Sequence, residues 1–488
     1  MVFVILAAMI KNHVISLLEK HLAFTPTVCQ RELMEGFSSV FVREEKDLIL
    51  LIKGFAGTGK TTLIKAIAQT LSTLERKVLL MAPTGRAAKV MATYSSMPAY
   101  TVHKTIYRQQ SSTDGMGRFV LDKNLHKNTW FIVDEVSLIS NQENENSFFG
   151  SGRLLEDLLE YVYSGVNCQL ILVGDTAQLP PVGLSISPAL EKLFFQKHGF
   201  EVKEFVLNEV VRQSADSGIL SCATHIRQLI EQGNHSGFFQ LELKHISDVT
   251  RVSGEDLIES INSCYGQYGL FETTVVTRSN KRANLFNLGI RNTILFRENE
   301  LERGDLLMVV KNNYHWSADN PELDFIANGD IAEVISIYSY EELYDFRFAN
   351  VCLSFIDYQG VELDCKIMLD TLSLESASLS ADQSRQLYDR VSEDYQEIKN
   401  KRTRWNKIRE NPFYNALQVK YAYALTCHKS QGGQWKAVFV DQGYLPEERM
   451  NQDYYRWIYT AFTRAEEKLY LVNFNNKFFS DQKTQEKD

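Results

Sequence analysis

The segment 54–61, GFAGTGKT, constrains the fold and the chemistry of this chain more than any other feature. It fits the pattern G-x-x-x-x-G-K-[ST]. The apolar run at 48–52 before it predicts a buried parallel strand, and apolar residues at helical spacing after it predict a helix. In that context the N–H groups of the loop and the helix N-terminus bind phosphate. The alternative is a glycine-rich turn with an exposed lysine.

The residues of this loop have separate predicted roles. The glycines let the backbone curl around phosphate oxygens, Lys60 would reach the β- and γ-phosphates, and the Thr61 hydroxyl would ligate Mg²⁺. We predict that the loop binds nucleotide through Gly54, Gly57, Thr58, Gly59, Lys60, Thr61 and Thr62.

A second apolar strand, at 130–133, ends in two carboxylates, Asp134 and Glu135. Asp134 is placed to hold Mg²⁺, and Glu135 is placed to polarise an attacking water. This pairing is typical of enzymes that use ATP to do work. The alternative, an acidic pair that caps a following helix, is disfavoured because the glycine loop lies upstream. The sequence therefore predicts nucleotide hydrolysis with ATP and Mg²⁺ as cofactors.

Composition narrows the class of protein. A chain of 488 residues predicts about three domains. Seven scattered cysteines, without C-x-x-C pairs or zinc-type spacing, predict reduced thiols and a cytoplasmic protein. The net charge of −9 argues against coating nucleic acid through bulk charge, but it allows a narrow basic channel.

The N-terminal segment 2–10 is apolar, but it lacks a basic leader and is too short to span a bilayer. We predict a core-facing first helix, or a translation start placed too far upstream, rather than a signal peptide. No other segment is predicted to cross a membrane, so no membrane partner is expected.

The order of elements predicts two α/β sets with an insert. Strands at 48–53, 77–82, 130–134 and 168–174 alternate with helices and predict a parallel sheet. A second set begins near 202 and resumes after 411. Short alternating strands between 300 and 375 predict a small β-barrel, and 380–410, without Gly or Pro, predicts one charged helix. That helix is either a solvated face or an arm that tracks DNA.

A hairpin signal interrupts the first α/β set. Asp114-Gly115 lies between β-prone runs, as in two-residue hairpin turns. A projecting hairpin could part a duplex as a rigid wedge, or it could be a solvated surface hairpin. The residues themselves favour neither.

Nine segments, met in order between about 24 and 473, resemble the motifs of superfamily 1 helicases. Thr25-Pro26 with Gln30 is similar to the adenine-reading Q motif, and the glycine loop is similar to motif I. The segment 174–182 resembles motif III in the form used by the RecD and Dda group, superfamily 1B. The others are 81–89 and 101–103 (motifs Ia and Ib), 134–137 (II), 207–213 (IV), 424–432 (V) and 459–465 (VI).

The resemblance implies an α/β fold with two RecA-like P-loop domains in tandem, a β-hairpin (1B) insert and an SH3-like β-barrel (2B) insert. The expected segments are 1–185 for domain 1A with the hairpin at about 104–128, 186–299 for the first part of domain 2A, 300–410 for the barrel and charged helix, and 411–488 for the second part of 2A. It also implies an ATP-dependent DNA helicase that moves 5′-to-3′, with single-stranded DNA and duplex junctions as partners.

The resemblance adds site residues. Gln30 would bind the nucleotide base, and Gln178 would sense the γ-phosphate and the water. Arg212 and Arg464, from the second α/β set, would complete the site only when the domains close; taken alone, each arginine could be a surface ion pair. The predicted catalytic residues are thus Lys60, Asp134, Glu135, Gln178, Arg212 and Arg464, and the metal ligands are Thr61 and Asp134.

Predicted DNA contacts lie at strand-to-loop transitions, where hydroxyl, imidazole and ammonium groups could hold phosphates without reading sequence. Each could equally cap a helix or a strand end. These residues are Pro83, Thr84, Gly85, His103, Thr426, His428 and Lys429. Trp316 and Trp435 are candidates for base stacking.

Other functions remain open. An RNA-directed helicase is one, because no motif reads the 2′-OH. A motor subunit of a nuclease complex, inactive alone, is another. A nucleotide-binding switch leaves motifs Ia, III, V and VI unexplained. The sequence does not select among DNA repair, recombination, plasmid transfer and phage replication.

Overall fold

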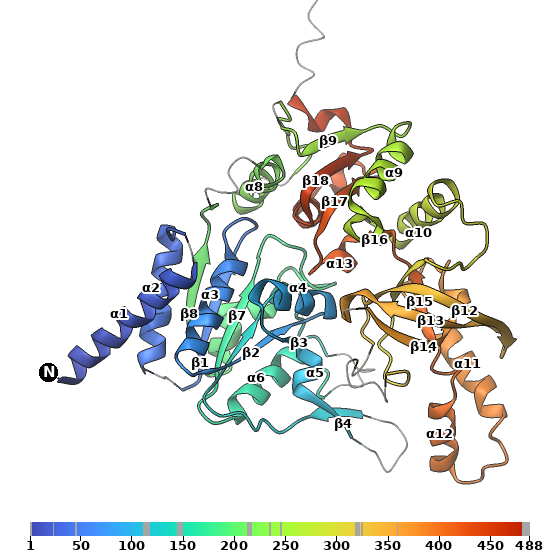
Figure 1. Cartoon of the computed structure of the whole chain (residues 1–488), viewed down its shortest axis with the longest axis horizontal. Coiled ribbons are helices and arrows are strands. Elements are labelled where there is room, and N and C mark those ends of the chain that lie inside the picture. Colours follow the sequence, from blue (N-terminus) through green and yellow to red (C-terminus); the bar gives the residue numbers. More distant parts are fainter. Residues whose placement is uncertain are drawn as a thin grey trace, which may run out of the picture.

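The computed structural model describes residues 2–22, 24–43, 46–110, 118–143, 150–211, 217–233, 236–244, 246–317, 323, 326–358 and 360–480. Two α/β bodies follow one another along the chain, and a β-barrel lies beside them (Figure 1). The predicted fold class is confirmed, because both sheets are parallel and the barrel is closed.

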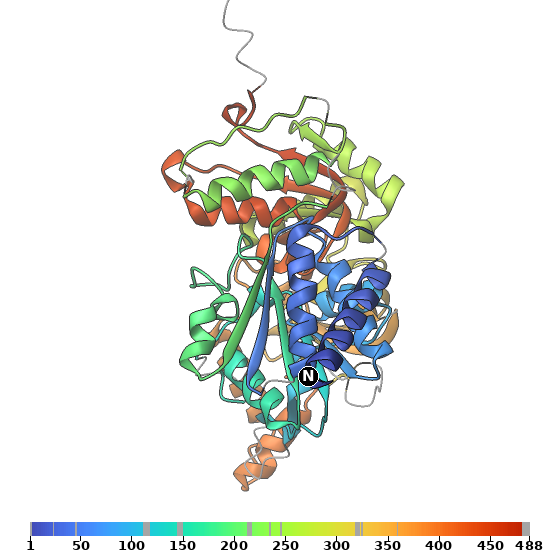
Figure 2. The same cartoon turned by 90° about the vertical axis from the view of Figure 1, so that its left-hand side faces the viewer.

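The first sheet has six parallel strands in the order β3-β2-β6-β7-β1-β8. Its central strands are apolar and buried on both faces, as parallel sheets covered by helices require. Figure 2 shows α1, α2 and α3 on one face and α6 on the other. The strands are β1 (Leu48–Gly54), β2 (Lys77–Ala82), β3 (Ala99–Thr101), β6 (Thr129–Val133), β7 (Gln169–Gly174) and β8 (Glu201–Leu207); the helices are α1 (Val2–Leu22), α2 (Val28–Arg43), α3 (Lys60–Thr73), α4 (Gly85–Ser95), α5 (Val102–Ile106), α6 (Leu154–Ser164) and α7 (Lys192–Lys197).

The predicted place of strand β8 is wrong. The sequence places the strand near 202 at the start of the second α/β set, but β8 is the edge strand of the first sheet. It pairs with β1 from Leu48–Glu201 to Gly54–Leu207. Pairing of strands more than 140 residues apart is set by the crossover connections, and the local sequence does not report it.

The second sheet is also parallel, in the order β16-β10-β17-β18-β9. Helix α14, which carries motif VI, packs against α8 and the sheet. The strands are β9 (Val249–Val252), β10 (Thr273–Thr277), β16 (Ala424–Thr426), β17 (Trp435–Asp441) and β18 (Ala465–Val472); the helices are α8 (Gly218–Glu231), α9 (Leu257–Tyr268), α10 (Asn280–Gly289), α13 (Cys427–Ser430) and α14 (Gln452–Phe462).

The barrel is closed by five strands: β11 (Leu306–Val309), β12 (Ile331–Leu343), β13 (Phe346–Phe355), β14 (Val361–Met368) and β15 (Leu417–Tyr421). Strand β15 was predicted to belong to the second α/β set. It instead pairs with β11 and β14 and closes the barrel, because an exposed strand edge is removed by that pairing.

The prediction of a single charged helix over 380–410 is wrong. The segment forms two helices, α11 (Ala381–Glu393) and α12 (Lys401–Glu410), which extend from the barrel in Figure 1. Asn400 ends the connection by capping α12, since its side chain accepts from the N–H groups of Arg402 and Thr403. Leu387, Val391 and Ile408 are buried against barrel residues.

The hairpin insert is described only at its arms. Strands β4 (Tyr107–Gln110) and β5 (Arg118–Leu121) pair antiparallel, and the predicted turn at Asp114-Gly115 lies outside the described residues. The ring of Phe119 lies 4.3 Å from that of Tyr314, measured between centroids, so an arm of the hairpin touches the segment that follows β11.

The N-terminal helix meets its prediction only in part. Val14, Leu18 and Leu22 of α1 are buried, but Ile5 and Met9 are 55% and 64% exposed. The first half of α1 is therefore not core-facing, because it extends beyond the helices on which the second half packs. Within the described residues, no helix combines the length and apolarity that crossing a bilayer requires.

A buried ion pair joins the second sheet to the barrel. Asp305, fully buried before β11, accepts hydrogen bonds of 2.8 and 2.9 Å from Arg291 and one of 2.9 Å from the Tyr423 hydroxyl. Arg291 is 2% exposed and lies in the turn after α10, and Tyr423 lies between β15 and β16. One carboxylate thus anchors the entry to the barrel and the exit from it.

We expect Asp305→Ala to lower the free energy of unfolding by about 3–5 kcal/mol, because it leaves the buried Arg291 guanidinium without its counter-charge. Urea denaturation followed by circular dichroism measures the loss. The control is Glu467→Ala, which removes an exposed partner 3.8 Å from Lys436 and is expected to cost at most about 1 kcal/mol. Equal losses in the two variants would contradict the anchoring role.

Candidate nucleotide site and strand-facing edge

The glycine loop connects β1 to α3 and has the geometry of a phosphate cradle. Gly57 and Gly59 have φ values of +74° and +79°, which favour glycine. A Cβ on Gly54 would lie 2.7 Å from Lys60 Cγ, and one on Gly59 would lie 2.7 Å from Gln30 Nε2. Because the loop admits no side chain at these positions, its backbone can curl closely around a ligand.

Gln30 holds α2 against this loop. Its buried amide donates a 3.0 Å hydrogen bond to the Thr58 carbonyl and accepts one of 3.0 Å from Thr27 N–H. The structure therefore brings Gln30 to the glycine loop, which its side chain positions; binding of the nucleotide base by Gln30 stays a prediction.

The Lys60 ammonium and the Asp175 carboxylate lie next to each other beside the glycine loop. Lys60 Nζ donates to the Phe55 carbonyl at 2.9 Å and lies 3.9 Å from Asp175 Oδ2. Asp175, at the end of β7, is 1% exposed. Burial raises the pKa of Asp175, while the Lys60 charge and the hydrogen bond from Tyr459 act in the opposite direction.

Tyr459 of the second body contacts both the glycine loop and Asp175. Its hydroxyl accepts from the N–H of Ala56, in the loop, at 2.8 Å and donates to Asp175 Oδ2 at 2.7 Å. Burial raises the pKa of Tyr459 well above 10, so the hydroxyl keeps its proton. Sequence reasoning missed Tyr459 and Asp175 as site residues, although both lie inside the segments that resemble motifs VI and III.

The paired carboxylates lie at the end of β6. Asp134 Oδ1 accepts from Glu135 N–H at 2.8 Å, and Oδ2 accepts from the Tyr94 hydroxyl at 2.9 Å. Desolvation and then the charge of Glu135 raise the pKa of Asp134. Glu135 has a φ of +53°, a left-handed conformation that is uncommon outside glycine and that clusters at functional sites.

Gln178 supplies an unsatisfied polar atom. Its side chain is 5% exposed, and among the described residues Oε1 has no hydrogen-bond partner. A buried amide oxygen without a partner points to a ligand, a water or a change of conformation. Together with the cradle and the two carboxylates, it makes the donor set fit a nucleotide with Mg²⁺.

The two predicted arginines have different outcomes. Arg212 lies outside the described residues. Arg464 is buried, and its guanidinium donates to the carbonyls of Thr460 and Gly433 at 3.0 and 3.1 Å and to the Thr463 hydroxyl at 3.2 Å. These partners all belong to the second α/β body, so Arg464 does not contact the glycine loop in this structure.

The segment after β7 touches the second body directly. Leu179 N–H donates to the Thr460 hydroxyl at 2.8 Å, and its carbonyl accepts from Gln431 at 2.8 Å. The residues that resemble motifs III, V and VI are therefore in direct hydrogen-bond contact.

The predicted DNA contacts of the first body lie at the carboxyl ends of β2 and β3. Thr84, which follows Pro83, caps α4 by accepting from Ala87 N–H at 3.2 Å, so the capping alternative holds for it. A Cβ on Gly85 would lie 2.7 Å from Asp330 Oδ1, which shows how closely the barrel approaches. His103 is half-buried, and desolvation lowers its pKa to about 4, so its imidazole is neutral at pH 7.

The predicted DNA contacts of the second body lie at the carboxyl end of β16. Thr426 is half-buried at the start of α13, and His428 is exposed. Lys429 donates to the side chain of Asn328, which lies in the loop before β12. Burial, and then the charge of Lys420, lower the pKa of Lys429 to about 8.

The two tryptophans predicted as candidates for base stacking have different outcomes: Trp435 is buried, whereas Trp316 is half-buried and stays a prediction. Trp435 is 3% exposed, and the Arg86 guanidinium lies 4.0 Å from its ring centroid. Trp316 donates to the Asn415 carbonyl at 2.8 Å and packs against the core. The Trp435 prediction is wrong, because folding buries the strand β17 that carries it.

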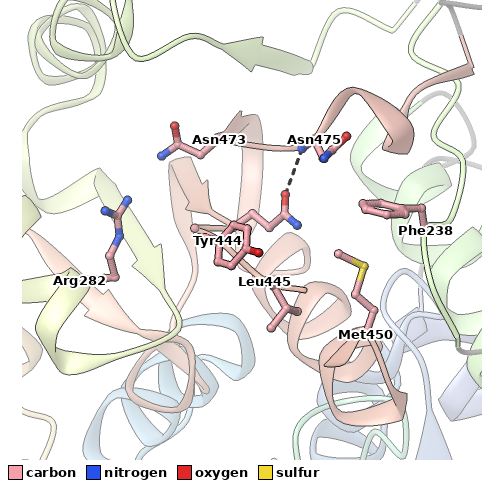
Figure 3. Close-up of a pocket in the computed structure, with 9 residues that line it drawn as sticks. Phe238, Arg282, Tyr444, Leu445, Met450, Asn473 and Asn475 are labelled. Carbon is pink, nitrogen blue, oxygen red and sulfur yellow. Dashed lines mark hydrogen bonds between the residues drawn. The ribbon is translucent and has the colours of Figure 1, made fainter. Parts of the chain in front are cut away.

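A separate hollow of about 450 Å³ lies at the carboxyl ends of β17 and β18 (Figure 3). Tyr444 is 92% exposed at its mouth, and Phe238 lies across from Arg282. Arg282 is bound to Asp441 through two hydrogen bonds of 2.8 Å. The hollow contains none of the predicted site residues, and no motif in the sequence signals it.

Two family models match parts of the chain. The AAA domain family matches residues 30–240, and the UvrD-like helicase C-terminal domain family matches residues 421–472. The ATP-dependent RecD2 DNA helicase of Deinococcus radiodurans is 24% identical over 457 residues, which are 91% of this chain and 50% of that protein. The chain thus spans half the length of that relative.

A second relative is the ATP-dependent DNA helicase dda of Enterobacteria phage T4. It is 27% identical over 295 residues, which cover 57% of this chain and 61% of that protein. Among solved structures, the Pif1 helicase from Bacteroides, in complex with ADP-AlF3 and ssDNA, aligns with 93% of this chain and 94% of its own, with 14% identity and a TM-score of 0.46.

Proposed function

We propose that this chain, which is related to the superfamily 1B helicases of the RecD and Dda group, is an ATP-dependent DNA helicase. One observation carries the proposal. The glycine loop of the first body contacts Tyr459 of the second body at 2.8 Å, so a nucleotide bound in that loop would lie where the two bodies meet. Hydrolysis at such a junction depends on how the bodies close, which is how a motor couples chemistry to movement.

The residues of the first body would hold and activate the nucleotide. Lys60 would exchange the Phe55 carbonyl for a phosphate oxygen, and Gln178 Oε1 would accept from the attacking water. Glu135 would take the proton of that water. Mg²⁺, held by Thr61 and Asp134, would neutralise charge on the phosphates.

The second body would complete the site on closure. Arg464 would leave the Thr460 and Gly433 carbonyls and turn toward the γ-phosphate, with Arg212 beside it. An arginine in this role contributes about 10³–10⁵ in rate. Until the bodies close, the carbonyls of Thr460 and Gly433 would serve as the hydrogen-bond partners of Arg464.

The strand would lie across the carboxyl ends of β2, β3 and β16, held by the predicted contact residues. Hydrogen bonds would dominate, because His103 is neutral and Thr84 and Thr426 are uncharged. Such contacts position a strand without reading its sequence. The names of the RecD2 and dda relatives support DNA as the substrate, and the group resemblance supports 5′-to-3′ movement.

The remaining predictions stay proposals. The domain limits proposed from sequence need β8 moved to the first domain and β15 moved to the barrel insert. The hairpin of β4 and β5 would be the wedge. Seven buried, unpaired cysteines support a cytoplasmic protein. An RNA-directed helicase and a motor subunit of a nuclease complex are the competing functions.

Strand displacement with ATP and Mg²⁺ tests the function. The substrates are matched duplexes with a 5′ or a 3′ single-stranded tail, of DNA or of RNA, and the control is Lys60→Ala. We expect unwinding of the 5′-tailed DNA duplex alone, with none by Lys60→Ala. Unwinding from the 3′ tail would overturn the polarity, and preference for RNA tails would overturn the substrate. Strand-stimulated ATPase activity without unwinding would favour the subunit alternative.

We expect Glu135→Gln to reduce ATP turnover by at least about 100-fold while nucleotide binding persists, because the amide cannot accept the proton of the attacking water. Turnover by phosphate release and affinity by a fluorescent nucleotide measure the two quantities separately. Lys60→Ala is the comparison, since it should weaken binding as well. A Glu135→Gln enzyme with normal turnover would remove Glu135 from its role.

We expect single-stranded DNA binding to weaken as pH rises through about 8, since Lys429 then loses its charge. The magnitude of the slope of log affinity against log salt should fall between pH 7 and pH 9 by up to about 0.7, the value of one phosphate contact on a single strand. Fluorescence anisotropy at several salt concentrations measures it.

Two variants control for this pH effect. Lys429→Arg keeps its charge and should retain the slope at pH 9. Lys436→Ala removes a lysine at the opposite, amino end of the second sheet and should leave the slope at both pH values as in the wild type. A slope in Lys429→Arg that falls as much as in the wild type would contradict the assignment.

A further inference from the structure

Helix α4 extends from Thr84, one of the predicted DNA contacts, to the carboxylate pair Asp134 and Glu135. It begins at Gly85, directly after the Thr84 cap, and ends at Ser95. Eleven residues at 1.5 Å each make it about 16 Å long. Tyr94, in its last turn, donates a hydrogen bond of 2.9 Å to Asp134 Oδ2.

This bond completes the orientation of the Asp134 carboxylate. Its other oxygen accepts from Glu135 N–H at 2.8 Å, so each oxygen has one fixed donor and retains lone pairs for a ligand. Groups that hydrogen-bond to a ligating carboxylate set its direction and tune metal affinity. Desolvation and the charge of Asp134 raise the pKa of Tyr94 well above 10, so the hydroxyl remains a donor at neutral pH.

The first half of α4 contacts the two parts of the molecule that would move. Lys89 donates to the Ile356 carbonyl at the end of the barrel strand β13. Arg86 packs over Trp435 at 4.0 Å and donates to the Gln434 carbonyl at 3.4 Å. A Cβ on Gly432, in the motif V segment, would lie 2.8 Å from the Ala87 Cβ.

We propose that Tyr94 is a positioning residue for Asp134, and that α4 links the placement of the barrel and the second body to the magnesium-binding carboxylate. The inference rests on the proposed function. A strand held between Thr84 and Thr426 would press on the start of α4, and a helix of three turns carries that displacement to its other end. Strand binding would thereby alter the affinity of the site for Mg²⁺.

The test compares Tyr94→Phe with the wild type. We expect the Mg²⁺ concentration that gives half-maximal binding of a fluorescent ADP analogue to rise about tenfold, the lower end of the range for outer-shell partners. The same shift should appear in ATP turnover, with turnover at saturating Mg²⁺ changed less than twofold. A changed Mg²⁺ requirement with nearly unchanged turnover at saturating Mg²⁺ would distinguish a residue that positions Asp134 from one whose loss lowers activity in general.

Tyr163→Phe is the matched control. The Tyr163 hydroxyl donates a 2.7 Å hydrogen bond to the Leu48 carbonyl in the same body, away from the carboxylates. It should lose a comparable amount of thermal stability and keep the wild-type Mg²⁺ dependence. An equal shift of Mg²⁺ dependence in Tyr163→Phe would overturn the proposal, because the effect would then be structural.

A separate measurement, the effect of single-stranded DNA on the Mg²⁺ requirement, tests the link through α4. In the wild type, saturating single-stranded DNA should lower the half-maximal Mg²⁺ concentration, and Tyr94→Phe should abolish that response. Lys89→Met, which removes the ammonium bond to the barrel, should reduce the response but keep the DNA-free value. Unchanged Mg²⁺ dependence in Tyr94→Phe would overturn the inference alone, whereas a wild type without ATPase activity would overturn the proposed function.

Discussion

The Tyr459 hydroxyl, between Ala56 N–H and the Asp175 carboxylate, is the contact on which the arrangement of the site depends. It is donor and acceptor at once, and it is buried, so both bonds are made in a low-dielectric environment where an unpaired partner would be costly. Because Tyr459 belongs to α14 of the second body and Asp175 directly follows β7 of the first, any rotation of one body against the other must break or replace these bonds. In the proposed function, nucleotide contacts at the loop and movement of the two bodies would therefore involve the same atoms.

The elements that sequence predicted correctly are those whose signal is local. Strands β1, β2, β6 and β7 are short apolar runs, and the glycine loop identifies itself by spacing. Strands β8 and β15 were assigned to the wrong sheet because pairing partners lie far away in the chain; β15 pairs with β11 across more than 100 residues. The division of 380–410 into two helices depends on the cap at Asn400, a single residue within a strongly charged segment.

The site was predictable to the same extent. Lys60, Asp134, Glu135 and Gln178 follow strand ends in the first sheet, and the sheet brings them to one edge without further information. Tyr94 carries no comparable signal, since only the direction of α4 relative to β6 brings its hydroxyl to Asp134. Arg464 was assigned a role that requires closure, and its bonds to Thr460 and Gly433 come from the packing of the second body, which no spacing in the sequence reports.

The chemistry of the predicted DNA-contact residues would reconcile the negative net charge of the chain with the nucleic-acid binding that we propose. A chain with a net charge of −9 repels a phosphate backbone at long range, so attraction has to be local. Among these residues the imidazole of His103 is neutral, and Lys429 is close to losing its proton because burial and Lys420 disfavour its charge. A phosphate beside Lys429 would restore the favoured charged form. Binding energy would then come from pairing the desolvated Lys429 ammonium with a phosphate rather than from an excess of positive charge. Such a contact suits a strand that is released and rebound at each step.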